Sequence, residues 1–225
     1  VERVWRFLSG DALGFVACGG GAYCAAHVGL YKAFKESGIE FDLLVGTSGG
    51  AAMAAAFASE IPPQEIDERI HRMFITGKAL QRYSVPRYSV FDHTHFDHHL
   101  MSEYGNTLIE DLWKPYFAVS MDLADCSLEV HRTGPVWSAI RASAAIPALL
   151  PPFYTERGQM LVDGSVIANV PIDVMHQIKT GPNIVVTFSP AIDERSRIDY
   201  RDLPARRDLI WKSMNPWSRR DLPNA

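Results

Sequence analysis

Cysteine is scarce in this sequence. Only Cys18, Cys24 and Cys126 occur among 225 residues, and no two of them form a C-x-x-C pair. The odd number argues against a disulfide framework, and the spacing argues against a zinc site. We therefore expect a protein of a reducing compartment such as the cytoplasm.

Long apolar runs and an excess of one charge are also missing. No run reaches the roughly 20 residues of a membrane span, and the N-terminus lacks the three regions of a signal peptide. The net charge of −4 argues against a nucleic-acid-binding protein. Transient membrane-surface contact stays open, because it needs only a local apolar surface. Since the first residue is Val1 and not methionine, we expect a fragment of a longer chain.

No low-complexity run or internal repeat divides the chain, and 47% of its residues are hydrophobic, so we expect one domain over residues 1–225. The apolar run Leu13–Cys18 leads through three glycines into a segment with helical periodicity, Tyr23–Ser37. A second unit of this kind follows at Phe41–Ala58. Two such units in succession predict a three-layer α/β/α fold with a mainly parallel central sheet.

The second unit contains the pattern Gly46-Thr47-Ser48-Gly49-Gly50. A G-x-S-x-G sequence between a strand and a helix is typical of a nucleophile elbow, whose glycines leave room for a crowded turn. Ser48 is then the candidate nucleophile. The alternative is a serine that merely caps the helix.

The glycine loop of the first unit, Gly19-Gly20-Gly21, could serve either a nucleotide or an ester. No Lys-Ser/Thr pair follows it, as a phosphate-binding loop would need, and Cys24 interrupts the dinucleotide pattern G-x-G-x-x-G. Beside a nucleophilic serine, the backbone N–H groups of such a loop can stabilise the negative oxygen of the reacting carbonyl. We therefore expect an oxyanion hole.

A partner for the serine is expected at Asp163, which follows the predicted strand Gln159–Val162 and precedes a glycine. A carboxylate at the C-terminal end of a strand lies on the same rim of the sheet as Ser48. The alternative is an aspartate in a β-turn. A triad histidine following the acid would have to be His176, which we expect to face outward from a helix.

Histidines and aspartates gather in the weakly periodic segment Lys78–Gly105: His93, His95, His98, His99, Asp92 and Asp97. Such a cluster suggests a metal ion, but a metal site needs ligands at fixed geometry. We expect a solvated, mobile lid or loop and no metal. Together with Phe91 and Phe96 of this segment, apolar residues further along the chain are expected to form an entrance for an acyl chain: Leu149, Leu150, Pro151, Pro152 and Phe153.

Periodicity and apolar runs predict the remaining elements. Helices are expected at Val1–Gly10, Ile61–Gly77, Leu108–Trp113 and Val136–Ala144, strands at Tyr116–Met121, Ser127–His131 and Asn183–Phe188, and a polar, arginine-rich segment at Pro190–Leu209.

Three separated motifs together resemble the patatin-like phospholipase family: CGGGAYC from Cys18, GTSGG from Gly46 and DGS from Asp163. Three longer stretches are similar to its neuropathy-target-esterase-like branch, whose members hydrolyse lysophospholipids and phospholipids: IEDLWKPYFAVSMDLA from Ile109, WSAIRASAAIPALLPPF from Trp137 and WKSMNP from Trp211. The resemblance covers nearly the whole chain.

The resemblance implies a serine lipid acyl hydrolase. Its catalytic pair would be Ser48 and Asp163 without a histidine, its oxyanion hole would be formed by Gly19, Gly20 and Gly21, and it would need no metal or organic cofactor. Phospholipids or lysophospholipids would be its substrates, met at a membrane surface. Members of this branch often carry a regulatory cyclic-nucleotide-binding domain upstream.

One motif departs from the family pattern. The family loop reads G-G-G-A-R-G, whereas Tyr23 and Cys24 occupy the last two positions here. The alternative to an active hydrolase is therefore a catalytically impaired lipid-binding or regulatory relative.

Overall fold

The computed structural model of the chain describes residues 1–80, 83–84 and 89–188. Val1–Phe188 forms one compact unit. The segment Pro190–Leu209 and the WKSMNP stretch lie outside the described residues, so the expectation of one domain over 1–225 stays a prediction. None of the described helices is both long and apolar enough to span a bilayer.

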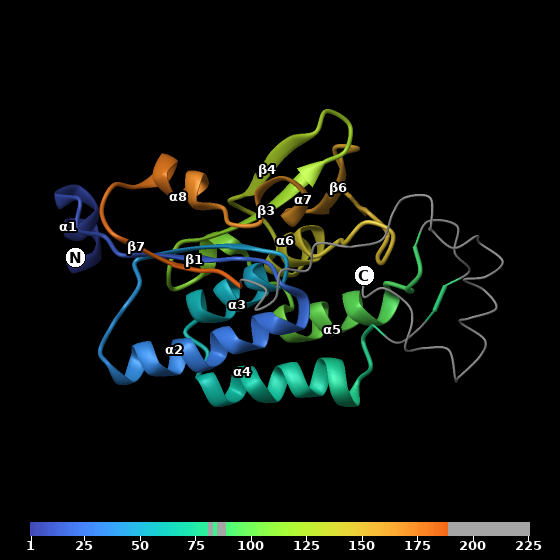
Figure 1. Cartoon of the computed structure of the whole chain (residues 1–225), viewed down its shortest axis with the longest axis horizontal. Helices are drawn as coiled ribbons and strands as arrows, with labels where there is room; N and C mark the ends of the chain where they lie inside the picture. Colours follow the sequence, from blue (N-terminus) through green and yellow to red (C-terminus); the bar gives the residue numbers. More distant parts are fainter. Residues whose placement is uncertain (81–82, 85–88, 189–225) are drawn as a thin grey trace, which may run out of the picture. The chain divides into compact units, whose positions relative to one another are not determined.

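Seven strands form a single sheet in the described part of the chain (Figure 1). They are β1 (Gly14–Ala17), β2 (Leu43–Thr47), β3 (Tyr116–Asp122), β4 (Ser127–His131), β5 (Phe153–Tyr154), β6 (Met160–Asp163) and β7 (Asn183–Val186). The order is β5-β6-β3-β2-β1-β7, and β4 also pairs with β3. The centre, β7-β1-β2-β3, is parallel, whereas β4, β5 and β6 join by antiparallel pairing.

Helices cover both faces of this sheet. They are α1 (Glu2–Ser9), α2 (Ala26–Glu36), α3 (Gly49–Ala58), α4 (Pro63–Ile70), α5 (Thr94–Tyr104), α6 (Val136–Ser143), α7 (Ser165–Ala168) and α8 (Ile172–Ile178), with short turns η1 (Gly21–Ala25), η2 (His71–Thr76) and η3 (Ile109–Asp111). Figure 1 shows α2, α4 and α5 on one side of the sheet and α8 on the other.

Alternating side chains of the central strands build a core on each face. Phe15 of β1 and Leu44 of β2 join the larger core under α2, α3, α5 and α6. Their neighbours Val16 and Val45 join the smaller core, which includes Met175 of α8. Strands buried on both faces are typical of a parallel sheet between helical layers. The predicted three-layer α/β/α fold is confirmed.

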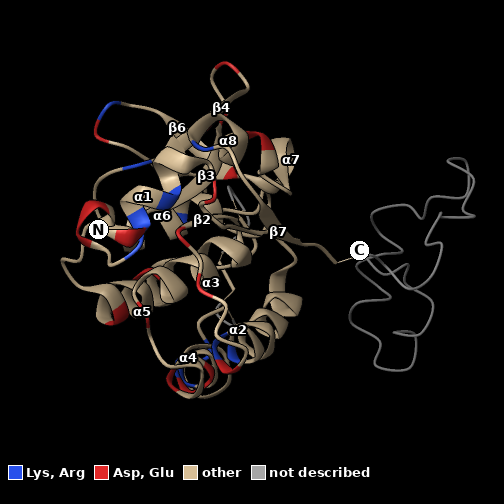
Figure 2. Cartoon of the chain, turned by 90° about the vertical axis from the view of Figure 1, so that its left-hand side faces the viewer, with Lys and Arg blue, Asp and Glu red and all other residues tan. Residues whose placement is uncertain are grey.

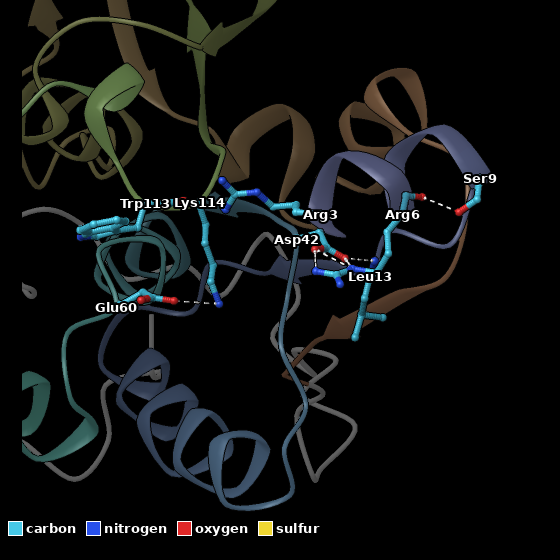
Figure 3. A network of polar contacts seen from close by, with 8 residues as sticks. All are labelled: Arg3, Arg6, Ser9, Leu13, Asp42, Glu60, Trp113 and Lys114. Atoms are coloured by element: carbon cyan, nitrogen blue, oxygen red, sulfur yellow. Dashed lines mark hydrogen bonds and ion pairs between the residues drawn. The ribbon is translucent and has the colours of Figure 1, made fainter. Parts of the chain in front are cut away.

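The first helix is fixed to the N-terminal edge of the sheet by an ion pair. Figure 3 shows the Arg6 guanidinium facing the carboxylate of Asp42, which directly precedes β2; the shortest contact is 2.6 Å. Asp42 Oδ2 also accepts the Leu13 N–H at 3.0 Å. Burial alone would raise the pKa of Asp42, but these hydrogen bonds lower it, so the pair stays charged. Figure 2 shows acidic and basic residues side by side around α1 and α4.

Two sequence-based expectations need correction. Residues 94–104 of the expected lid or loop form a regular helix, α5. Its buried apolar positions are Phe96 and Leu100, too few in 11 residues to stand out as helical periodicity among three histidines. The helix predicted over Ile61–Gly77 changes after Ile70 into η2, which is a π-helical turn.

A further correction concerns the strand that carries Asp163. The argument from a shared rim holds for parallel strands, but β6 is antiparallel to β3. Residues 118 and 119 of β3 pair with both β2 and β4, so these two strands lie on opposite edges of β3. Residues 120–122 pair with both β4 and β6, so β6 lies on the same edge of β3 as β2. β6 therefore runs toward the end of β2, and its last residue arrives beside the residue that follows β2.

Candidate active site

Ser48 lies in the sharp turn between β2 and α3. Its backbone has φ 54° and ψ −128°, a left-handed region that a residue with a side chain rarely adopts and that costs about 1–3 kcal/mol. Its N–H donates to Ser143 Oγ at 2.8 Å, and Ser143 Oγ donates to the carbonyl of Val119 at 2.6 Å. Ser143 is fully buried at the end of α6, so α6 and β3 together hold the strained turn.

Close packing behind the serine explains one glycine of the elbow. A Cβ at Gly50 would lie 2.3 Å from the carbonyl oxygen of Cys18, at the end of β1. Any side chain there would push the start of α3 away from the glycine loop. Gly50 thus lets Ser48 and the glycine loop lie next to one another.

The Ser48 side chain is hydrogen-bonded to Asp163. Ser48 Oγ donates to Asp163 Oδ2 at 2.7 Å, and Asp163 Oδ1 accepts the Ser165 N–H at 2.8 Å. Asp163 is fully buried, and burial raises its pKa although the hydrogen bonds from Ser48 and Ser165 oppose the shift. A carboxylate with a raised pKa is a stronger base, which suits a group that must accept a proton from a hydroxyl.

Further contacts join the three motifs and were not anticipated from the sequence. Thr47 Oγ1 donates to the carbonyl of Ala168 at 2.8 Å, which links the end of β2 to α7. The Gly19 N–H donates to the carbonyl of Asn169 at 3.3 Å, which links the glycine loop to the same segment. Thr47 lies inside the elbow motif and Ser143 inside the stretch that begins at Trp137, but Asn169 belongs to none of the motifs or stretches named above.

The glycine loop lies beside the serine, and its residues differ in what they contact. Gly19 uses its N–H within the protein, whereas the N–H groups of Gly20 and Gly21 meet no acceptor among the described residues. Tyr23 is 76% exposed, while Cys24 is buried and donates its thiol to the carbonyl of Cys18 at 3.6 Å. Burial raises the pKa of Cys24 to about 12, so it stays a neutral thiol.

An apolar cavity of about 470 Å³ opens beside Ser48. Its size lies within the range of small-ligand sites. α3, α4, η2, α5 and α6 supply most of its wall, and Gly21, Ala22 and Cys24 complete it next to the serine. Of the residues expected at an acyl entrance, Phe96 and Leu150 line this cavity. The others are not among the lining residues: Phe91, Leu149, Pro151, Pro152 and Phe153.

The histidines lie elsewhere. His176 is exposed on α8, on the other side of the sheet from α3. The His131 ring contacts Ser120 Oγ at 2.8 Å, and burial lowers its pKa to about 4. His27 Nδ1 lies 3.0 Å from the carbonyl of Cys24. Within the described ranges, no hydrogen bond joins Asp163 to a histidine.

The expected histidine cluster falls at α5 and the residue before it. His93 Nε2 lies 3.9 Å from Asp97 Oδ2, which is within ion-pair distance. No group of three or more His, Cys, Asp or Glu side chains in the described part of the chain is arranged to hold a metal ion.

Comparison with known proteins adds a family match. Residues 15–176 match the family model described as patatin-like phospholipase. The chain is 34% identical over 221 residues to patatin-like phospholipase domain-containing protein 7 of Rattus norvegicus, covering 96% of this chain. It is 32% identical over 229 residues to lysophospholipase NTE1 of Yarrowia lipolytica, covering 99% of this chain. In both cases it spans 16% of the relative's length.

A likeness among solved structures supports the fold. The crystal structure of VipD from Legionella pneumophila matches 91% of this chain and 52% of that chain, with a TM-score of 0.50 and 13% sequence identity. At this identity the match bears on architecture alone.

Proposed function

The chain belongs to the patatin-like phospholipase family, and from this premise we propose that it is a serine hydrolase that cleaves acyl esters of phospholipids or lysophospholipids. One observation carries the proposal. The hydroxyl of Ser48 donates a 2.7 Å hydrogen bond to the buried carboxylate of Asp163, and the same serine lines an apolar cavity. A nucleophile, a base and an acyl-sized apolar space therefore meet at one point.

The proposed reaction has two halves. Ser48 Oγ attacks the ester carbonyl while its proton passes to Asp163 Oδ2, and the resulting oxyanion accepts hydrogen bonds from the N–H groups of Gly20 and Gly21. The leaving alcohol takes the proton from Asp163, which leaves an acyl-enzyme. Water then attacks the acyl carbonyl, gives its proton to Asp163, and the fatty acid departs as the proton returns to Ser48.

The energetics explain why a carboxylate can replace histidine. A carboxylate with a reference pKa of about 3.9 is a weaker base than an imidazole at about 6.5, by roughly 3.5 kcal/mol of driving force. The raised pKa of Asp163 offsets part of this deficit. One oxyanion donor contributes about 3–4 kcal/mol, so two N–H groups in the glycine loop can offset the remainder.

Substrate would come from a lipid surface. Phe74 and Ile75 of η2 line the cavity and are 37% and 63% exposed. Apolar side chains that belong both to the cavity and to the surface can contact a bilayer while an acyl chain passes into the site. We therefore propose peripheral, transient membrane contact at η2.

A fluorophosphonate probe tests the assignment directly. We expect covalent labelling at Ser48, found by peptide mass spectrometry, and loss of both labelling and lysophospholipid hydrolysis in Ser48→Ala. Asp163→Asn should remove most hydrolysis. The matched control is His176→Ala, which changes an exposed histidine and should leave activity within about tenfold, or about 1.4 kcal/mol in barrier.

Two results would contradict the proposal. Labelling that persists in Ser48→Ala would move the nucleophile elsewhere. A collapse of activity in His176→Ala, with the fold intact by circular dichroism, would indicate a triad in place of the Ser48–Asp163 pair.

A further inference from the structure

The cavity extends along α3. Ser48, Ala52 and Ala56 all line it, and residues four apart lie on one side of a helix. At 1.5 Å per residue, the eight residues from Ser48 to Ala56 correspond to about 12 Å. The cavity thus has a catalytic end at Ser48 and a remote end at Ala56.

Contacts of α5 and α6 show which side chains lie at each end. Asp97, near the start of α5, is paired with Arg141 of α6, two residues before the Ser143 that holds Ser48. The other end of α5 lies by the start of α6, because the Thr107 N–H donates to the carbonyl of Tyr104 and the Val136 N–H donates to the carbonyl of Thr107. Phe96 is therefore near the catalytic end, and Glu103 and Tyr104 are remote from it.

Two contacts between the α4–η2 segment and α5 bracket the cavity. At the catalytic end the rings of Phe74 and Phe96 have centroids 6.3 Å apart. At the remote end Arg69 Nη1 of α4 lies 3.2 Å from Glu103 Oε2 of α5. Arg69 and Glu103 are the only charged residues among those described as lining the cavity.

The ion pair is braced on both sides. Arg69 Nη2 also contacts Glu65 at 2.6 Å, and Glu103 Oε1 contacts Arg72 at 3.2 Å. The Arg69 and Glu103 side chains are 25% and 14% exposed, so the pair is largely shielded from solvent but keeps some contact with water. An apolar chain that reaches it would meet an ion pair held by two further charged partners, Glu65 and Arg72.

We infer that the Arg69–Glu103 ion pair is the floor of the acyl site and sets the longest acyl chain that binds fully extended. This rests on the proposed function, because it takes the cavity to hold the acyl chain. Each methylene buried before the floor should strengthen binding about fourfold, which corresponds to about 0.8 kcal/mol. A methylene beyond the floor gains nothing, because it must fold back or separate a hydrated ion pair.

The experiment measures binding, so that it does not depend on turnover. Saturated fatty acids of even length from octanoate to stearate, each below its critical micelle concentration, are titrated into the full chain carrying Ser48→Ala. Affinity should rise with each pair of methylenes and then level off. With Arg69→Ala added, affinity should keep rising for at least one further pair of methylenes, a gain of about tenfold or more for the longest acids.

Arg72→Ala is the matched control, since it removes another positive charge from the same cluster but Arg72 does not line the cavity. It should leave the levelling point unchanged. In Arg69→Ala, Glu103 keeps Arg72 as a partner, and Arg69→Met provides a bulkier neutral replacement if the alanine variant does not fold. Arg69→Met should also move the levelling point, because the flexible neutral side chain can yield to the acyl chain.

The outcomes separate this inference from the function on which it rests. If affinity levels off at the same chain length in both Arg69 variants as in the parent, or if Arg72→Ala shifts that length equally, the Arg69–Glu103 pair is not the floor of the site. The hydrolase proposal would remain intact. Absence of binding at every length would also overturn it, even if Ser48 of the parent protein is labelled by fluorophosphonate. Failure of that labelling would count against the hydrolase proposal itself.

Discussion

Ser143 offers a sharp test, because its hydroxyl accepts the N–H of Ser48, the proposed nucleophile, and Ser143 does not line the cavity. In Ser143→Ala, the Ser48 N–H loses its acceptor and the carbonyl of Val119 loses a donor, both in a buried place. An unsatisfied buried group costs about 1–3 kcal/mol. With partial relaxation, we expect a loss of about 2 kcal/mol in the free energy of unfolding, which is about 4–8 °C in melting temperature for a domain of this size.

The same substitution should slow the chemistry. Ser48 has a strained backbone, and without the Ser143 contact its turn can relax and move the hydroxyl away from Asp163. A displacement of about 1 Å can cost up to about 100-fold in rate. We expect the rate constant for fluorophosphonate labelling to fall at least about tenfold at a temperature where the variant is fully folded.

Ser138→Ala is the control for both measurements. Ser138 also lies on α6 and also donates to a backbone carbonyl, that of Pro135 at 2.8 Å, but it is not buried. Its replacement should change the free energy of unfolding by no more than about 0.5 kcal/mol. If Ser143→Ala melts and labels like the parent protein, or if Ser138→Ala loses as much, Ser143 does not hold the elbow in the way described.

Three further predictions follow from the same site. Because the folded-state pKa of Asp163 is raised, stability should fall as pH rises from the ordinary aspartate pKa through the raised value. Asp163→Asn should therefore have the same melting temperature as the parent protein at low pH and a higher one at neutral pH; an equal difference at all pH values would contradict this. Hydrolysis by the parent protein should decline as pH falls through the raised pKa. Gly164→Ala should lose labelling and stability, because its Cβ would lie 2.4 Å from a carbonyl oxygen of β3. In the control, Gly29→Ala on α2, the Cβ meets no atom within 4 Å, and the substitution should be neutral or stabilising by up to about 1 kcal/mol. Urea denaturation compares the free energies of unfolding of the two variants. Tyr23→Arg with Cys24→Gly should raise kcat on lysophospholipid by about tenfold or more, since an arginine supplies a charged donor and glycine frees the loop; an unchanged or lower kcat, with both proteins folded, would mean that the loop does not limit the reaction.

Local pattern was sufficient for much of the fold and for the identity of the candidate residues. The short apolar runs at β1 and β2 and the glycine turns after them specify strand, turn and helix within about 15 residues each, because turn geometry and helix propensity act over neighbouring residues. Ser48 and the glycine loop could be identified in this way. Asp163 could be identified as a residue, but the parallel geometry assumed for its strand was wrong.

Tertiary structure decided how the parts meet. The direction of β6 depends on pairing with β3 about 40 residues away, and such pairing leaves no mark in the local sequence. Helix α5 has too few buried positions to be recognised alone and forms where Phe96 and Leu100 find the core. Nothing in the local sequence distinguishes Arg69 and Glu103, and Ser143 is not singled out within the stretch that begins at Trp137. Their proposed roles depend on packing, which brings Ser143 to Ser48 and the ion pair to the wall of its cavity. Contacts of that kind are a property of the folded chain and not of any segment within it.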